Sequence, residues 1–291
     1  MNKKSPRGRV VVISGGSSGI GYAVADVLLD RGAIVCLIAR DENRLKNAAQ
    51  ALRRKHPGAS VFYYSCDVSN YEHLQATVQM IANDATRIDW IINNAGIAET
   101  GRIESQPISK MRAAMDTNYW GYVYLTLAAM PYLMNSSGAA IAFVSSVAGY
   151  VGLFGYSHYA PSKFAVTGLA ECLRMEFQDY GIQVTVVYPP DTNTPMHERE
   201  RLHTLPECAA LSANAKVVSA DYVAVQLANG IQNGRYEVFC NGQSKAIRIL
   251  RVLAPQFFFA LVDGMVHRSR IRRLQRRAGV NLPSDGDLRV L

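Results

Sequence analysis

Short apolar runs alternate with longer stretches of helical spacing between residues 9 and 240, and this alternation constrains the fold more than any other feature. The runs are rich in β-branched residues and apolar at nearly every position, which is typical of strands buried on both faces of a parallel sheet. The stretches between them are long enough for crossover helices on both sides. The sequence therefore predicts an α/β, doubly wound fold around a seven-stranded parallel sheet. The predicted strands are 9–14, 34–39, 61–65, 88–92, 140–145, 184–188 and 236–240, and the predicted helices are 19–31, 42–55, 71–84, 107–134, 157–180 and 220–233.

The charge of the chain is concentrated at one end. The formal net charge is +8, and residues 245–291 carry +7 of it, so residues 1–244 are close to neutral. We therefore predict a folded body over 1–244 and an apolar, arginine-rich helical extension over 245–291. The five cysteines form no CxxC or Cys/His grouping, so we expect neither a disulfide framework nor a metal site. The apolar stretch near the N-terminus is too short for a signal sequence, which favours a cytoplasmic location.

A glycine-rich turn follows the first predicted strand and opens the first predicted helix, in the spacing GxxxGxG. Glycines at such a junction allow a tight turn and let backbone N–H groups approach a pyrophosphate at the positive end of the helix. The alternative is a turn that only packs the helix against the sheet. A dinucleotide site here would include Gly15, Ser17, Ser18, Gly19, Ile20 and Gly21.

The GxxxGxG spacing resembles that of the short-chain dehydrogenase/reductase family, and five further elements of that family's pattern follow in register. The resemblance implies a Rossmann-fold oxidoreductase in which the aspartate after the third strand contacts adenine and the turn after the fourth strand borders the cofactor. The matching elements are Asp67-Val68, Asn93-Asn94-Ala95-Gly96, Asn118, Ser146 and Tyr159-x-x-x-Lys163.

Tyr159 and Lys163 are four residues apart on a predicted helix, so they share one face. A cation about 4 Å from a phenol supplies roughly 4 kcal/mol at an effective dielectric of about 20, which would bring the phenol pKa from about 10 to about 7. The pair alone could equally be an exposed helix face. The resemblance implies that Tyr159 protonates the substrate, Ser146 hydrogen-bonds its oxygen, Lys163 also holds the nicotinamide ribose, and Asn118 holds a water of a proton relay.

Two residues beside the tyrosine need a separate interpretation. Proline is tolerated only in the first turn of a helix, so Pro161 predicts that the helix begins close to Tyr159 or is distorted there. His158 directly precedes the tyrosine, and we expect it to be a spacer rather than a catalytic acid.

The end of the second predicted strand decides which dinucleotide is bound. Enzymes that use NAD usually place an acid there, whereas this strand ends in Ala39 and is followed by Arg40. A guanidinium can pair with a 2′-phosphate, so we predict NADPH as the cofactor. Asp41 leaves an alternative open, because it could bind a ribose hydroxyl or simply cap the next helix.

The loop after the sixth predicted strand is rich in proline and threonine. The resemblance implies that Thr194 contacts the nicotinamide carboxamide and that Pro189 and Thr192 also border the cofactor. Most of the family has Pro-Gly where this chain has Pro189-Pro190. A rigid loop without ligand contact is the alternative.

Three further motifs are Gly152-Leu153-Phe154-Gly155, Gly168-Leu169-Ala170-Glu171 and the Pro-Pro-Asp-Thr-x-Thr-Pro variant at 189–195. Together they resemble one branch of the family, the 3-ketodihydrosphingosine reductases, most closely over 145–195 and little after about residue 245. The resemblance implies NADPH-dependent reduction of the 3-keto group of a lipid ketone to sphinganine, in sphingolipid biosynthesis. The chain departs from the branch at Pro161 and in the segment 196–215, which we expect to cover the substrate. Other hydrophobic carbonyls (a steroid, a retinoid or a 3-oxoacyl thioester) remain alternatives, as does a non-enzymatic dinucleotide sensor.

The extension begins with an uncharged run over 252–262, which is too short to span a bilayer, followed by a cluster of arginines. This order suits peripheral contact with anionic lipid at the cytosolic face of a membrane. The alternatives are packing on the pocket and a dimer interface, and we expect a homo-oligomer but no nucleic-acid partner. The clustered arginines are Arg268, Arg270, Arg272, Arg273, Arg276 and Arg277.

Overall fold

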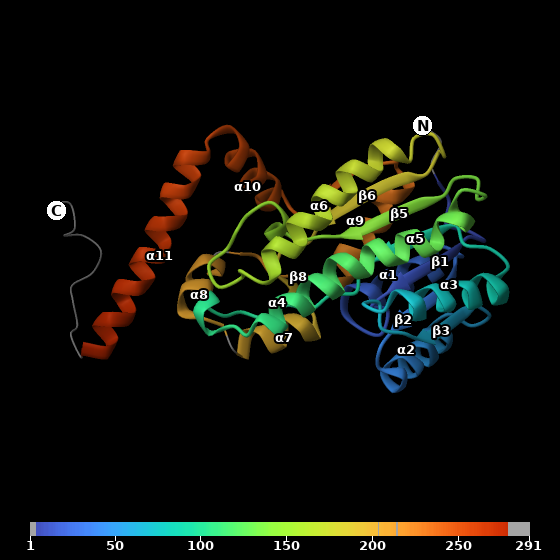
Figure 1. Ribbon diagram of the computed structural model, residues 1–291, viewed down its shortest axis with the longest axis horizontal. Coiled ribbons are helices and arrows are strands. Elements are labelled where there is room, and N and C mark those ends of the chain that lie inside the picture. Colours follow the sequence, from blue (N-terminus) through green and yellow to red (C-terminus); the bar gives the residue numbers. More distant parts are fainter. Residues whose placement is uncertain (1–3, 203, 214, 279–291) are drawn as a thin grey trace.

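The computed structural model describes residues 4–202, 204–213 and 215–278 (Figure 1). Its centre is a seven-stranded sheet in the order β3-β2-β1-β4-β5-β6-β9, and every neighbouring pair is parallel. The predicted doubly wound sheet is therefore confirmed. Its strands are β1 (Val10–Ser14), β2 (Ile34–Ala39), β3 (Val61–Ser65), β4 (Trp90–Asn93), β5 (Ala140–Val144), β6 (Gln183–Tyr188) and β9 (Glu237–Phe239).

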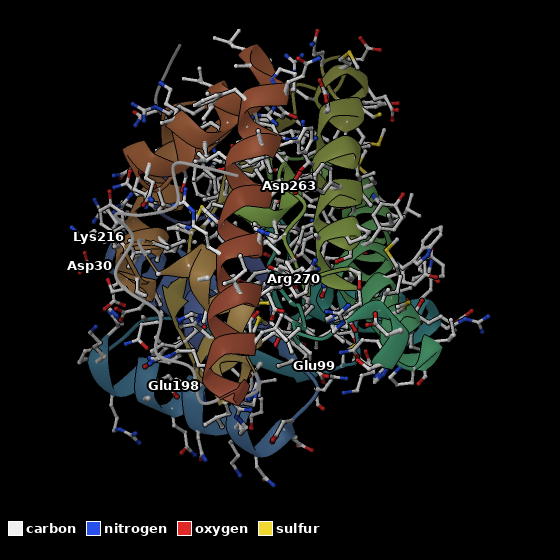
Figure 2. All side chains as sticks on the ribbon, turned by 90° about the vertical axis from the view of Figure 1, so that its left-hand side faces the viewer. Asp30, Glu99, Glu198, Lys216, Asp263 and Arg270 are labelled. Atoms are coloured by element: carbon white, nitrogen blue, oxygen red, sulfur yellow. The ribbon has the colours of Figure 1, made fainter. Side chains whose placement is uncertain are left out.

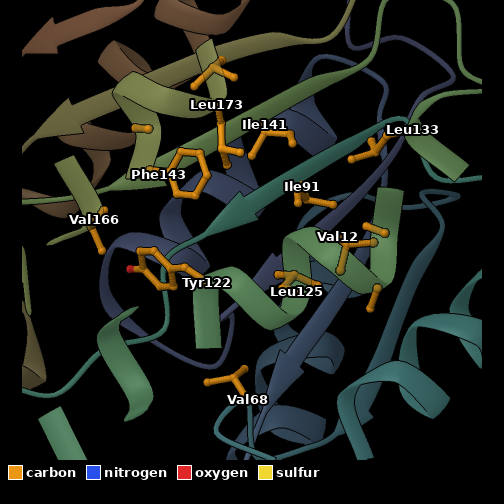
Figure 3. Close-up of a cluster of buried hydrophobic side chains, with 14 of the residues drawn as sticks. Val12, Val68, Ile91, Tyr122, Leu125, Leu133, Ile141, Phe143, Val166 and Leu173 are labelled. Carbon is orange, nitrogen blue, oxygen red and sulfur yellow. The ribbon is translucent and has the colours of Figure 1, made fainter. Parts of the chain in front are cut away.

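Helices cover both faces of the sheet because successive side chains of a strand point to opposite sides. Val10 and Val12 of β1 belong to one buried cluster, and Val11 and Ile13 belong to the other. Figure 3 shows part of the first cluster, in which Tyr122 lies among aliphatic side chains. The first cluster is covered by α3 (Tyr71–Ala85), α5 (Gly121–Leu133) and α6 (Tyr159–Glu176), and the second by α1 (Gly19–Asp30), α2 (Glu42–Lys55) and α9 (Ala220–Gln232).

The predicted helix 107–134 is interrupted in its middle. A short 3-10 turn, η1 (Ile103–Ser105), precedes α4 (Ile108–Met115), and a π-helical turn, η2 (Asp116–Trp120), separates α4 from α5. Such single π turns often occur at functional sites. This one contains Asn118, one of the predicted site residues.

Helix α6 begins at Tyr159, which agrees with the expectation drawn from Pro161. Pro161 is the third residue of the helix, where its missing N–H would have no intrahelical partner anyway. The tyrosine is therefore held at the rigid start of a helix rather than inside it.

The strand order reverses between β1 and β4, which are neighbours in the sheet but not in the sequence. The chain leaves these two strands toward opposite sides, so their carboxyl ends open a crevice. A short 3-10 turn after β5, η3 (Val147–Gly149), and a two-stranded pair formed by β7 (Thr192–Asn193) and β8 (Val218–Ser219) stand at the same edge.

The C-terminal part forms the predicted helical extension. Between β7 and β8 lie α7 (Pro195–Leu202) and α8 (Pro206–Ser212), and after β9 come α10 (Gly242–Leu253) and α11 (Pro255–Ala278). Figures 1 and 2 show α11 running along the outside of the molecule, and it packs against α8. The predicted boundary at 244/245 falls within α10. Of the predicted arginine cluster, the side chains of Arg272, Arg273, Arg276 and Arg277 lie outside the described part of the chain.

Candidate active site

A cleft with a cavity volume of about 440 Å³ opens at the carboxyl ends of the strands. It brings together predicted residues from seven separate segments of the sequence. Gly21, Asp67 and Asn118 are the predicted residues that do not line it. The predicted residues on its wall are Gly15, Ser17, Ser18, Gly19, Ile20, Arg40, Val68, Asn94, Ala95, Gly96, Ser146, Tyr159, Lys163, Pro189, Thr192 and Thr194.

The glycine turn after β1 is packed too closely for a side chain at Gly15 or Gly21. Gly15 has a φ of +69°, and a Cβ there would lie 2.8 Å from Asn94 Nδ2. A Cβ on Gly21 would lie 2.3 Å from the carbonyl oxygen of Gly15, so this glycine serves the close approach of α1 to the turn. Asn94 fixes the arrangement, because its Nδ2 donates to the Ser14 carbonyl at 2.9 Å.

The N-terminus of α1 has no side-chain cap, a property that it shares with α4 and α6. Its N-cap residue, Ser18, makes no side-chain capping bond, and its first turn holds no acidic residue. By contrast, side chains cap α2, α3, α9 and α10. The backbone N–H groups of α1 therefore face the cleft with positive potential, which fits a pyrophosphate.

The turn between β2 and α2 presents two arginines to the cleft. Strand β2 ends at Ala39, and Asp41 Oδ1 accepts a hydrogen bond from the Arg44 backbone N–H at 3.0 Å, so Asp41 caps α2. Arg40 lies 3.9 Å from the Asp67 carboxylate and is largely exposed. Arg44 also lines the cleft and was missed in the sequence, although its position four residues after Arg40 was the available signal.

Asp67 stands beside the cleft rather than on its wall. Its Oδ1 accepts from the backbone N–H of Ser69 at 3.0 Å and from the Ser69 hydroxyl at 2.8 Å, which fixes the loop after β3. Its neighbours Cys66 and Val68 do line the cleft.

Lys163 is buried beneath the catalytic end of the cleft. Its Nζ donates to the Val144 carbonyl at 2.9 Å and to the Tyr122 hydroxyl at 3.3 Å, and lies 5.8 Å from the centre of the Tyr159 ring. Ser146 lies within hydrogen-bond reach of the Tyr159 phenol. The three predicted catalytic side chains Ser146, Tyr159 and Lys163 therefore share one site.

Burial shifts the two titratable groups of this site in opposite directions. Burial raises the pKa of Tyr159 above its usual range; the Ser146 hydrogen bond partly opposes this, and the charges of Glu200 and Asp191 add to it. Burial lowers the pKa of Lys163 to about 7. The predicted lowering of the phenol pKa is not found, because desolvation of the phenol is the largest effect and it raises the pKa. The resulting site favours a protonated phenol, the form that can donate a proton.

Asn118 acts on the loop after β4. Its Oδ1 accepts from the Ile97 N–H at 2.8 Å, and its Nδ2 donates to the Ile97 carbonyl at 3.0 Å and to the Ser162 hydroxyl at 2.9 Å. Because both amide hydrogens are used, a water held by Asn118 could only donate a hydrogen bond, either to the side-chain Oδ1 or to the backbone carbonyl. The side chain thus links β4, the π turn and α6.

His158 is a buried structural residue, as expected. Its Nε2 accepts a hydrogen bond from the Glu99 backbone N–H at 3.2 Å, and burial lowers its pKa, so the ring is neutral. It does not line the cleft.

The loop after β6 closes the cleft opposite the glycine turn. A Cβ on Gly19 would lie 3.2 Å from the methyl group of Thr194. The Pro189 carbonyl accepts from the Val147 N–H at 3.2 Å, which ties this loop to the turn that carries Ser146.

The substrate end of the cleft contains residues that the sequence did not single out. Segment 196–215, expected to cover the substrate, forms α7 and α8, and both contribute to the wall. Helix α10 also lines the cleft, so the C-terminal extension is part of the pocket. These additional residues are Tyr156, Asp191, His197, Glu200, Cys208, Leu211, Gln243 and Ile247.

A glycine turn at the switch point of a doubly wound sheet, with Ser146, Tyr159 and the buried Lys163 in the same cleft, is typical of the class of dinucleotide-dependent oxidoreductases. The chain belongs to the short-chain dehydrogenase/reductase family, because the family model described as short chain dehydrogenase matches residues 9–204. The protein is therefore an oxidoreductase.

Curated relatives narrow the comparison. The chain is 35% identical over 273 residues to a protein of Dictyostelium discoideum named 3-ketodihydrosphingosine reductase, covering 88% of this chain and 82% of the relative. It is 37% identical over 220 residues to a Danio rerio protein named 3-dehydrosphinganine reductase, covering 75% and 66%. The crystal structure of levodione reductase superimposes with a TM-score of 0.75 at 27% identity, covering 82% of this chain and 98% of that one.

Proposed function

We propose that the protein is an NADPH-dependent reductase that converts the 3-keto group of 3-ketodihydrosphingosine to the alcohol of sphinganine. The observation that carries the proposal is the combination of a cleft lined by Ser146, Tyr159 and Lys163 with curated relatives whose names state this activity and which match over most of the chain. The apolar side chains of the substrate end, such as Leu153, Leu211 and Ile247, suit a long hydrocarbon chain.

The residues of the cleft fit a phosphorylated dinucleotide. The uncapped N-terminus of α1 suits the pyrophosphate, and the tight contact of Gly15 with Asn94 leaves the backbone exposed for close approach. Arg40 and Arg44 would hold a 2′-phosphate by charge-assisted hydrogen bonds. Asp41 also lines the cleft, but its Oδ1 accepts the N-cap hydrogen bond of α2, which favours the two arginines as the cofactor contacts at this turn.

The mechanism divides the reduction between the cofactor and the chain. NADPH, when bound, supplies a hydride to the carbonyl carbon. Tyr159 then donates its phenolic proton to the carbonyl oxygen, and Ser146 hydrogen-bonds that oxygen and fixes its position. Lys163 is held by Val144 and Tyr122, and in its protonated form it stabilises the phenolate left behind.

The extension supports a further part of the proposal, peripheral contact with a membrane. Among the described residues, no single helix could span a bilayer; α10 and the first part of α11 reach the required length and hydropathy only together, across a bend of 119°. At this bend Val252, Leu253 and Phe257 are 67%, 78% and 63% exposed. Apolar side chains at the apex with arginines farther along α11 suit the surface of an anionic bilayer, from which a lipid ketone could enter the cleft.

A competition assay tests the proposed activity. The purified protein is given NADPH with 3-ketodihydrosphingosine, a steroid ketone and a 3-oxoacyl thioester at equal concentration, and products are identified by mass spectrometry. We expect sphinganine as the main product. Preferred reduction of either other carbonyl would replace the substrate assignment, and cofactor binding without any product would favour a dinucleotide sensor.

A further inference from the structure

The substrate end of the cleft contains two carboxylates that form no ion pair with any described residue. Glu200 on α7 and Asp191 before β7 both line the cleft. In the described part of the chain, Glu200 Oε1 is buried and has no hydrogen-bond partner. A buried acceptor without a partner is costly, so this position favours a ligand that supplies a donor.

Tyr156 connects this carboxylate to the reacting phenol. The rings of Tyr156 and Tyr159 are 6.0 Å apart, and the Tyr156 hydroxyl hydrogen-bonds the Glu200 side chain. Glu200 is therefore only one side chain away from the group that donates the proton.

The electrostatic surroundings of the Glu200 carboxyl favour a positively charged ligand. Tyr156, Asp191, His197 and Cys208 face it from the loop before α6, the loop before β7, α7 and α8. Burial raises the pKa of Glu200 and the charge of Asp191 adds to this, whereas Tyr156 and His197 oppose it. A ligand cation at Oε1 would favour the ionised carboxylate and would be favoured by it in turn.

We propose, on the basis of the proposed function, that Glu200 binds the ammonium group on the carbon next to the reacting ketone and thereby selects 2-amino ketones. In 3-ketodihydrosphingosine the amine is at C2 and the ketone at C3. A carbonyl oxygen held by Ser146 and Tyr159 therefore brings the ammonium close to the same end of the cleft. Glu200 is thus a specificity-determining residue, and the neighbouring Asp191 adds negative potential.

The same contact would affect the phenol. The charges of Glu200 and Asp191 raise the pKa of Tyr159, and a cation placed between them offsets that effect. A substrate with the amine therefore makes the phenol a better proton donor than the same ketone without the amine does.

The experiment compares two substrates that differ only in the amine: 3-ketodihydrosphingosine and its 2-deamino analogue, 1-hydroxyoctadecan-3-one. Both are assayed with the wild type, with Glu200→Gln, which keeps the shape of the side chain, and with the control Glu198→Gln. Glu198 lies on the same helix, is exposed and does not line the cleft (Figure 2). NADPH affinity of each variant is measured as a check of folding.

We expect the wild type to prefer the amino ketone in kcat/KM by about tenfold or more, the usual range for a charge-assisted hydrogen bond. Glu200→Gln should remove most of that preference by slowing the amino ketone alone, while Glu198→Gln keeps it. Equal losses of kcat/KM on both ketones in Glu200→Gln, or an unchanged preference for the amino ketone in this variant, would overturn the inference. A wild type that reduces both ketones equally well would also overturn it without recourse to a variant. If the wild type reduces neither ketone, the proposed function itself fails.

Discussion

The sheet body and the C-terminal extension use the same kinds of side chain in opposite ways. In the body, apolar residues of the strands are buried on both faces, as with Val11 and Ile13, and even Lys163 is buried. In the extension, Phe258 is buried against the body while Leu253 and Phe257 stay exposed. The body therefore provides a desolvated environment around Lys163. The extension lines the cleft with α10 and exposes apolar side chains at its bend.

The largest effect should come from the body. Tyr159→Phe removes the proposed proton donor, and we expect kcat to fall by about 10²- to 10⁴-fold, the usual contribution of general acid catalysis. The ring still fills its place, so NADPH affinity should stay near that of the wild type. Steady-state kinetics and cofactor fluorescence check both expectations, and turnover at the wild-type rate would remove Tyr159 from the mechanism.

Lys163→Met tests whether burial of this lysine lowers the free energy of unfolding of the protein. The pKa of Lys163 is lowered from 10.5 to about 7, so between these values the unfolded chain binds a proton that the folded chain does not. Wild-type stability should therefore rise with pH across this window, and the variant should not show this rise.

The variant should lose activity, yet near pH 7 its free energy of unfolding should exceed that of the wild type by about 2 kcal/mol after the lost hydrogen bonds are counted. Urea denaturation at pH 7 and pH 10 measures the difference. An advantage that does not shrink toward pH 10 would contradict the assigned burial of the ammonium.

Arg40→Ala tests the cofactor end of the cleft. Loss of the proposed charge-assisted contact to the 2′-phosphate should weaken NADPH binding by about tenfold while NADH binding changes little. Arg54→Ala is the matched control, because Arg54 is an exposed arginine of α2 that does not line the cleft. Titrations of both cofactors measure the ratio, and equal weakening of NADPH and NADH would remove the phosphate contact.

The smallest effect on catalysis should come from the bend of the extension. Leu253→Asp and Phe257→Asp should weaken binding to anionic vesicles severalfold, since each removes apolar surface from the lipid contact. Reduction of a short water-soluble ketone should be unchanged. Met80→Asp, at an exposed position of α3, is the control. These substitutions test the lipid contact more specifically than deletion of the extension would, because deletion would also remove the packing of α11 against α8. Vesicle sedimentation measures the bound fraction. A bound fraction that is the same for the wild type and both variants would favour pocket packing as the only role of the extension.

Most of the sheet and of the cofactor turn could be predicted from the sequence. The strand at 34–39 and the helix at 42–55 occur at the predicted residues, because a buried strand and a crossover helix leave local periodic patterns. The start of α6 at Tyr159 was predictable from Pro161 for the same local reason.

The π turn around Asn118 could not be predicted, because its sequence has the spacing of an ordinary helix and the contacts of Asn118 with Ile97 and Ser162 join segments that are far apart in the chain. Glu200 was also missed, since a single acidic residue in a charged helix carries no local sign that it lies in a pocket.

The sequence by itself determined the order of the elements, the glycine turn and the spacing of Ser146, Tyr159 and Lys163. The tertiary structure alone decided how strongly the tyrosine and lysine are desolvated, that Arg44 joins Arg40, that Glu200 approaches the phenol through Tyr156, and that α10 lines the cleft. The physical reason is that hydrophobic period and turn chemistry act over a few neighbouring residues, whereas desolvation and charge proximity depend on segments far apart in the chain.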